Sequence, residues 1–166
     1  MDEGLRQFVR DRAGHRCEYC RILQEAEPFF TYHIEHIVAR QHGGGDDDGN
    51  LALACYHCNA HKGPNLSGLD PESGALVRLF HPRQDQWDEH FERNGVIIVG
   101  RTAIGRATVG LLKMNAADSR AVASDPVMYC SSISNPPVTK AACFVATRKA
   151  GILMQDPADG RVLIST

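Results

Sequence analysis

The apolar residues near the start of the chain recur at the spacing of one helical face. Leu5, Phe8 and Val9 fit that spacing, and the pattern stops at Gly14, a residue that commonly takes the left-handed conformation just past the end of a helix. The pattern therefore predicts a first helix that ends at Gly14.

The next regular segments change from helical to extended spacing. Residues 29–38 are mostly aromatic and β-branched, residues 43–49 are rich in glycine and aspartate, and residues 51–54 form a short apolar run. Two such runs separated by turn-forming residues predict a two-stranded hairpin with a mobile tip. Residues 58–62 end at Gly63-Pro64, which indicates a short helix directly after the hairpin.

Beyond residue 66 the pattern is weaker. Residues 67–75 are rich in turn formers, and we interpret the apolar run at 76–80 and the later Trp87 as packing elements. The remaining expected elements are a strand at 95–99, a helix at 106–114 and a terminal hairpin at 152–166.

Composition places the chain among soluble, folded proteins. Its 166 residues are 43% hydrophobic and 23% charged. No stretch approaches the roughly 18 apolar residues of a membrane span, and the opening residues lack a signal-peptide pattern. We expect a cytoplasmic protein with no membrane partner. The net charge of −2 hides an asymmetry, because residues 1–93 carry ten Lys and Arg against sixteen Asp and Glu, and residues 94–166 carry eight against four.

Four cysteines in the acidic part stand in two C-x-x-C pairs, Cys17 with Cys20 and Cys55 with Cys58, thirty-four residues apart. Each pair lets one tight turn present two thiolates to a single ion, so together they predict a tetrahedral structural zinc site. Two disulfides are disfavoured without a secretory signal. A thiol redox protein would need one such motif and would leave the second pair unexplained.

The residues between and after these pairs resemble the HNH endonuclease family. The shared order is R-C-x-x-C, E-H-I, G-G, N-L and C-x-x-C-N-x-x-K-G, over about residues 5–62. Residues 64–116 look similar to the extension of one bacterial branch of that family, and nothing is recognised beyond about residue 120. Two positions depart from the usual pattern: Glu35 stands where many members have aspartate, and Ala39 where proline is common.

The resemblance implies a nuclease that cleaves DNA with His36 as general base and leaves 5′-phosphate and 3′-hydroxyl ends. A neutral imidazole at pH 7 can accept a proton from water. The oxygens of Glu35 and Asn59 suit a hard cation such as magnesium or manganese. By resemblance they would hold one catalytic ion, and RNA is not excluded as substrate.

Five more residues are candidates for supporting roles. The resemblance makes Asn50 a positioning residue for the loop between the strands, and Lys62 lies one helical turn after Asn59, where it could meet a phosphate oxygen. His33 and His61 are candidate additional ligands of the ion, although a strand or helix histidine of this kind more often faces solvent. Arg40 is a weaker candidate phosphate contact.

Strand geometry raises a difficulty for this site. Adjacent strand residues point to opposite faces, so Glu35 and His36 could share an ion only if the strand ended at Glu35 or a bulge re-aimed one side chain. We expect such a bend. The acidic first part also requires local positive charge for DNA, and the arginines near the first cysteine pair could either form a basic strip or pair with nearby acids.

The expected fold class is α+β: a small ββα-metal HNH core with a four-cysteine structural zinc site, flanked by an N-terminal helix and a C-terminal extension. Residues 1–93 would form the HNH nuclease domain, residues 94–124 a strand and helix extension packed on it, and residues 125–166 a tail of unknown role. The alternative function is a non-catalytic zinc module that binds nucleic acid, in which the acid, histidine and amide residues are ordinary surface groups.

Overall fold

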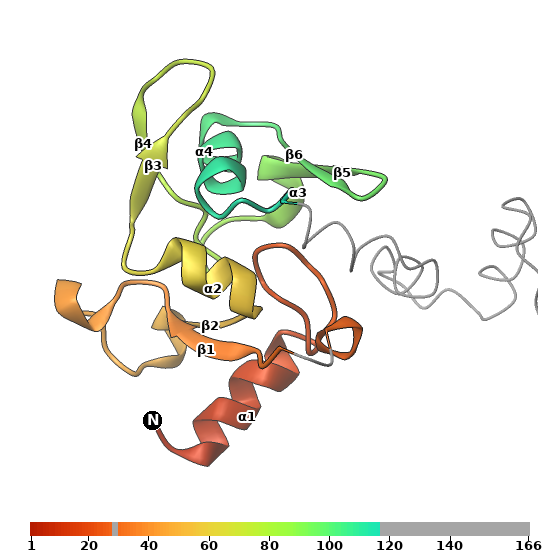
Figure 1. Cartoon of the computed structure of the whole chain (residues 1–166). Coiled ribbons are helices and arrows are strands. Elements are labelled where there is room, and N and C mark those ends of the chain that lie inside the picture. The colour runs from red at the N-terminus through yellow and green to blue at the C-terminus, as the bar shows by residue number, and fades with distance from the viewer. Residues whose placement is uncertain (28–29, 117–166) are drawn as a thin grey trace, which may run out of the picture. The chain divides into compact units, whose positions relative to one another are not determined.

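The computed structural model describes residues 1–27 and 30–116, all of which fall in one compact unit (Figure 1). The predicted terminal hairpin and the tail at 125–166 lie outside the described residues, as do residues 117–124 of the predicted extension. The boundary expected at residue 93 stays a prediction. Among the described helices, none has the length and apolar character that crossing a membrane requires.

Helix α1 (Glu3–Arg12) forms where the apolar spacing predicted it. The Asp2 side chain accepts a hydrogen bond from the Leu5 backbone N–H at 2.8 Å, which caps the first turn. Gly14, with φ +57°, takes the left-handed conformation just past the last turn. Val9 is fully buried, and the helix packs on both strands of the hairpin that follows. The predicted helix and its end are confirmed.

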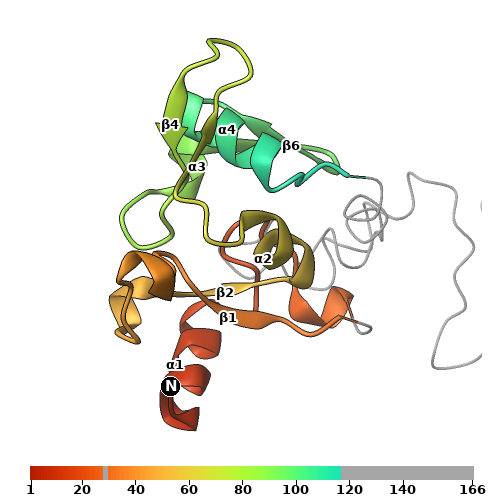
Figure 2. The same ribbon diagram turned by 60° about the vertical axis from the view of Figure 1, so that its left-hand side comes forward.

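The predicted hairpin consists of β1 (His33–His36) and β2 (Leu51–Ala54), which pair antiparallel with His33 opposite Ala54 and His36 opposite Leu51. Helix α2 (Tyr56–Lys62) follows directly. Figures 1 and 2 show α1 on one side of this hairpin and α2 on the other. All four residues of β2 are buried because helices cover both faces of the strand. The predicted strand-loop-strand-helix order is confirmed.

The loop between the two strands is folded rather than extended. It contains two short 3₁₀ turns, Arg40–His42 and Asp48–Asn50, and a third such turn, Gln24–Ala26, precedes β1. The Arg12 guanidinium on α1 donates hydrogen bonds to the backbone oxygens of Asp48 and Leu51, at 2.9 and 2.8 Å. Helix α1 therefore holds the far end of this loop, and Arg12 is not part of an exposed basic strip.

The second half of the described chain forms two small hairpins around a helix. Strands β3 (Ser67–Leu69) and β4 (Leu76–Arg78) form one, and β5 (Phe91–Asn94) and β6 (Ile97–Gly100) form the other. Helix α3 (Trp87–His90) leads into β5, and α4 (Ala103–Leu111) packs on β3, β4 and β6 (Figure 1).

Strand β3 is a correction to the turn-rich segment expected at residues 67–75. The turn itself is short, and buried Asp70 closes it by accepting a hydrogen bond from Ser73 Oγ at 2.6 Å. Arg106 on α4 also donates to Asp70, at 2.8 and 2.9 Å. These contacts fix the turn, and the three residues before it, Ser67–Leu69, pair with β4.

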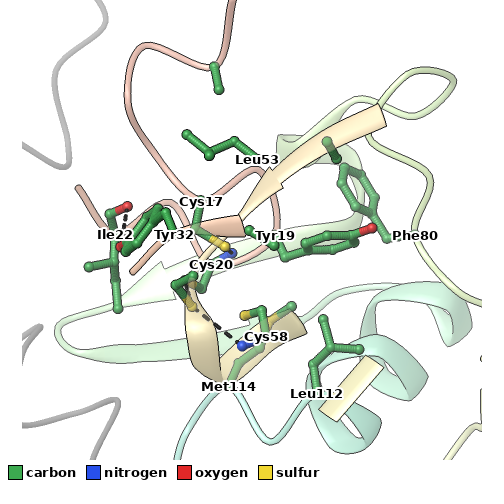
Figure 3. Close-up of a cluster of buried hydrophobic side chains, with 14 of the residues drawn as sticks. Cys17, Tyr19, Cys20, Ile22, Tyr32, Leu53, Cys58, Phe80, Leu112 and Met114 are labelled. Carbon is green, nitrogen blue, oxygen red and sulfur yellow. Dashed lines mark hydrogen bonds between the residues drawn. The ribbon is translucent and has the colours of Figure 1, made fainter. Parts of the chain in front are cut away.

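The first cysteine turn packs against this second half of the chain. Trp87 Nε1 donates to the backbone oxygen of Tyr19 at 2.8 Å, and Arg93 donates to that of Cys20 at 2.7 Å. The buried Glu18 carboxylate forms an ion pair with Arg83 and accepts from the Leu53 N–H at 2.8 Å. Figure 3 shows Tyr19 beside Phe80 in the shared core. The cysteine turn is thus enclosed by contacts from both halves.

Candidate active site and zinc centre

Four buried cysteines form a compact cluster beside the hairpin: Cys17, Cys20, Cys55 and Cys58. Their sulfurs all lie within 4.8 Å of one another, and Cys20 Sγ is 3.8 Å from Cys55 Sγ. Four thiolates at 2.3 Å from a tetrahedral zinc ion would be separated by about 3.8 Å. The donor set and its size therefore fit the predicted structural zinc, and the cluster lies among buried side chains (Figure 3).

Two tight turns present these sulfurs. In the first, the Cys20 N–H points at Cys17 Sγ at 3.5 Å, and in the second the Cys58 N–H points at Cys55 Sγ at 3.4 Å. Cys55 is the N-cap of α2, so the second pair lies on the first turn of that helix. Backbone donors aimed at sulfur favour the thiolate form that zinc binds. The site joins the turn after α1 to the start of α2.

His36 lies at the opposite end of the hairpin, as the last residue of β1, with its side chain 19% exposed. Its Nε2 is 2.7 Å from Asp46 Oδ1, and Asp46 also forms an ion pair with Arg40. The hydrogen bond from His36, followed by those from the Met1 amino group and Arg40, holds the pKa of Asp46 well below its usual value. When Nε2 carries the hydrogen that Asp46 accepts, the imidazole lone pair is on Nδ1.

Asn50 holds the backbone that leaves β1. Its Oδ1 accepts from the Val38 N–H at 2.8 Å, and its Nδ2 donates to the oxygens of Val38 and Gly45, both at 3.0 Å. The Asn50 backbone oxygen also accepts from the Ile37 N–H at 2.8 Å. These contacts are of the kind expected of a positioning residue, because they fix the peptide groups next to His36.

Gly44 allows this close packing. A Cβ atom at position 44 would lie 1.7 Å from the Val38 backbone oxygen and 2.7 Å from Asn50 Nδ2. No side chain fits there, so the loop reaches Asn50 only because residue 44 is glycine.

Glu35 lies on the other face of β1 from His36. The β1–β2 ladder pairs Glu35 with Ala52 and His36 with Leu51 in unbroken register. The expected bend between Glu35 and His36 is therefore wrong. Adjacent residues of a regular strand point in opposite directions, so the structure does not bring these two side chains together.

The Glu35 carboxylate is buried between two other side chains. The Tyr19 hydroxyl donates to its Oε1, and Lys62 Nζ lies 3.1 Å from its Oε2. Burial raises the pKa of Glu35, although the Lys62 charge and the Tyr19 hydrogen bond act in the opposite direction. Burial, followed by the negative charge of Glu35, also raises the pKa of Tyr19.

Lys62 differs most from its predicted role. Its side chain is 2% exposed, and Nζ also donates to the backbone oxygens of His36 and Ile37, at 3.2 and 3.0 Å. In this position the ammonium group faces the interior and does not meet a phosphate. Helical spacing alone could not reveal this, because the burial arises from packing of α2 on the hairpin.

In the described arrangement the predicted ligands of a catalytic ion contact other groups of the protein. Glu35 is engaged by Tyr19 and Lys62, and the partly exposed Asn59 lies on α2. His33 lies with its ring 6.3 Å from that of Tyr56, and His61 Nδ1 contacts the His57 oxygen at 2.9 Å. Within residues 1–27 and 30–116, the four cysteines are the one group of three or more His, Cys, Asp or Glu side chains placed to hold a metal ion.

Two residues of this site were missed by sequence reasoning. Asp46 stood in the glycine- and aspartate-rich segment that was interpreted only as the tip of the hairpin. Tyr19 carried no signal, because a tyrosine between two cysteines is compatible with many roles. Both are found only when the loop and the cysteine turn are seen against β1.

Comparison with known proteins supports the family seen in the motifs. The family model described as HNH endonuclease matches residues 17–65. A search of curated proteins found no match, and neither did a search of solved structures. The matched range begins at the first cysteine of the cluster and contains β1, β2, α2 and His36. Residues 17–65 of this chain are therefore an HNH endonuclease domain, built around a buried four-cysteine cluster.

Proposed function

We propose that this protein is an endonuclease that hydrolyses DNA phosphodiester bonds with His36 as the general base. The observation that carries the proposal is the contact between His36 Nε2 and Asp46 Oδ1, at 2.7 Å. It lies where β1 ends and the loop begins, within the matched HNH range. A partly exposed imidazole whose Nε2 is bound to a carboxylate has its other nitrogen available as a base.

In this mechanism Nδ1 of His36 removes a proton from a water molecule as the water oxygen attacks the phosphorus. The bond to the 3′ oxygen breaks, and that oxygen takes a proton from solvent, which leaves a 5′-phosphate and a 3′-hydroxyl. Asp46 fixes the orientation of the ring and stabilises the imidazolium that forms. Arg40, whose side chain is 65% exposed, is the nearest described cation to this pair and could contact a phosphate oxygen.

A magnesium or manganese ion on Glu35 and Asn59 stays a prediction from the resemblance. The Glu35 carboxylate would first have to leave Lys62 and Tyr19, so no step above passes through an ion. Structural zinc on the four cysteines is a separate matter, since those residues fit it.

A plasmid-nicking assay in the presence of magnesium or manganese tests the proposal. Replacing a general base costs about 10²- to 10⁴-fold in rate, so we expect the nicking rate of His36→Ala to fall by that factor. His42→Ala is the matched control, because His42 is an exposed histidine of the same loop whose ring contacts the side chain of its neighbour Gln41. Equal nicking rates for the wild type and His36→Ala would reject the mechanism.

A second candidate function is a zinc module that binds nucleic acid without cleaving it. The Glu35–Lys62 ion pair favours it, since this pair removes two of the predicted site groups from solvent. This function predicts DNA or RNA binding with no cleavage by the wild type under any divalent ion.

A further inference from the structure

We propose that Lys62 is a positioning residue for His36, and that Glu35 and Tyr19 hold it in place from the first cysteine turn. This inference rests on the proposed function, because the group being positioned is the proposed base. It gives Glu35 and Lys62 a role that differs from metal binding and from phosphate binding.

The first step of the argument is the geometry around the Lys62 ammonium group. Nζ lies 3.2 Å from the His36 oxygen, 3.0 Å from the Ile37 oxygen and 3.1 Å from Glu35 Oε2. The Gly63 backbone oxygen lies farther from Nζ, at 3.4 Å. An ammonium group has three donors, so the three nearer acceptors are enough to satisfy it. With 2% of its side chain exposed, Lys62 has no substitute partner in bulk water.

The second step is that two side chains hold the same short stretch of backbone. Lys62 binds the carbonyl groups of His36 and Ile37, and Asn50 binds both backbone groups of Val38. The peptide groups that immediately follow the base are therefore fixed by donors from α2 and from the end of the loop. Displacing Lys62 would free two of these carbonyl groups and allow the His36 backbone to shift.

The third step connects this arrangement to the cysteine cluster. The Tyr19 hydroxyl donates to Glu35, and Tyr19 is a fully buried residue between two of the clustered cysteines. Trp87 binds the backbone oxygen of Tyr19 from the second half of the chain. The counter-ion of Lys62 is thus oriented by the turn that the zinc would close.

The fourth step separates positioning from stability. A buried ion pair contributes little net stability when both partners are replaced by apolar groups of similar volume, whereas loss of one partner leaves an uncompensated charge. Replacing both Glu35 and Lys62 should therefore keep the protein folded while removing the hydrogen bonds to the His36 and Ile37 carbonyls.

The experiment compares the full-length wild type with the double variant Glu35→Leu/Lys62→Met. A displaced catalytic group of this kind costs about 10²-fold, so we expect kcat for nicking to fall by that factor while KM for DNA changes less than about threefold. The zinc content and the unfolding transition should remain those of a folded protein.

The matched control is Asp70→Asn/Arg106→Met, which removes another ion pair whose carboxylate is buried, between the β3–β4 turn and α4. We expect it to leave kcat unchanged, because neither residue contacts the His36 backbone. If the Leu/Met variant does not fold, Tyr19→Phe removes one hydroxyl only, and we expect kcat about three- to tenfold below that of the wild type.

A second readout does not depend on activity. In the wild type, nitrogen NMR should show the His36 Nε2 hydrogen bonded to Asp46, and the Leu/Met variant should lose that signal while the control keeps it. A Leu/Met variant with wild-type kcat and an intact His36 signal would overturn the inference. If the wild type does not cleave DNA, the proposed function fails, and the His36 signal still decides whether Lys62 positions the ring.

Discussion

The two ends of the β1–β2 hairpin are held in different ways. At the cysteine end, where His33 pairs with Ala54, four buried sulfurs lie within 4.8 Å of one another. At the loop end, where His36 pairs with Leu51, the structure depends on separate hydrogen bonds that the side chains of Asn50, Lys62 and Asp46 form with residues 36–38. The cysteine end can be held by a single metal ion, whereas the loop end is held by several separate hydrogen bonds.

The two ends therefore differ in what they contribute: the cysteine end contributes folding stability, and the loop end fixes the position of His36. A structural metal joins distant segments in one all-or-none event, and its binding free energy becomes folding free energy. The contacts at the loop end are individually worth about 0.5–3 kcal/mol, the charged ones most, yet each fixes one atom relative to His36. We therefore expect damage at the cysteine end to unfold the domain, and damage at the loop end to impair cleavage before it unfolds the domain.

The largest effect should follow the loss of one zinc ligand. Structural zinc contributes about 10 kcal/mol or more of binding free energy, which exceeds the total stability of many domains of this size. We expect Cys20→Ser to be unfolded by circular dichroism and to contain less than one zinc per chain. As a control, wild-type protein stripped of zinc should refold when zinc is restored, and Cys20→Ser should not. A folded, zinc-free variant would show that hydrogen bonds alone hold the cysteine end.

The next effect concerns Gly44 at the loop end. The Cβ of Gly44→Ala would collide with the Val38 oxygen at 1.7 Å, so the loop must move away from Asn50. We expect about 10²-fold slower nicking from a protein that remains folded with bound zinc. Gly45→Ala is the control, since its Cβ would meet only the end of the Asp47 side chain, at 3.2 Å. Equal losses in both variants would contradict the role of Gly44.

The smallest effect should come from Asp46. Asp46→Ala removes the acceptor of His36 Nε2 but leaves Asn50 and Lys62 in place. Partners that orient a functional histidine are commonly worth 10- to 100-fold, and we expect a loss near tenfold in kcat with the thermal unfolding midpoint almost unchanged. Asp47→Ala, at an exposed neighbouring position, should have no effect on kcat. A tenfold loss in Asp47→Ala as well would indicate a general effect of loop charge.

The sequence predicted the cysteine end well because its signal is local. Two C-x-x-C spacings define two turns, and the apolar patterns around them define α1, the hairpin and α2. Asn50 contacts Val38 and Gly45, and its role in positioning His36 stays a prediction from the family motif. In each case the information lies within a few residues of the element concerned.

The loop end could not be predicted in the same way, because its contacts depend on packing between elements distant in sequence. Strand alternation alone predicts that Glu35 and His36 lie on opposite faces of β1, as the ladder shows. A bend was expected only because both residues were assigned to the site of one ion. Lys62 follows Asn59 by one helical turn, which suggested exposure, yet packing on the hairpin buries it against Glu35. The contact between Asp46 and His36 depends on how the loop folds, which the sequence pattern does not reveal.

The enclosure of the first cysteine turn has a consequence for how fast a zinc ion bound there would exchange. Trp87 and Arg93 bind the backbone oxygens of Tyr19 and Cys20, and Arg83 pairs with Glu18 beside them. Because the four cysteines are buried, a competing ligand reaches the sulfurs only after some of the surrounding contacts open. The residence time of a zinc ion held there should therefore follow the opening rate of the described residues after α2, so that a substitution at Trp87 shortens it without altering any thiolate.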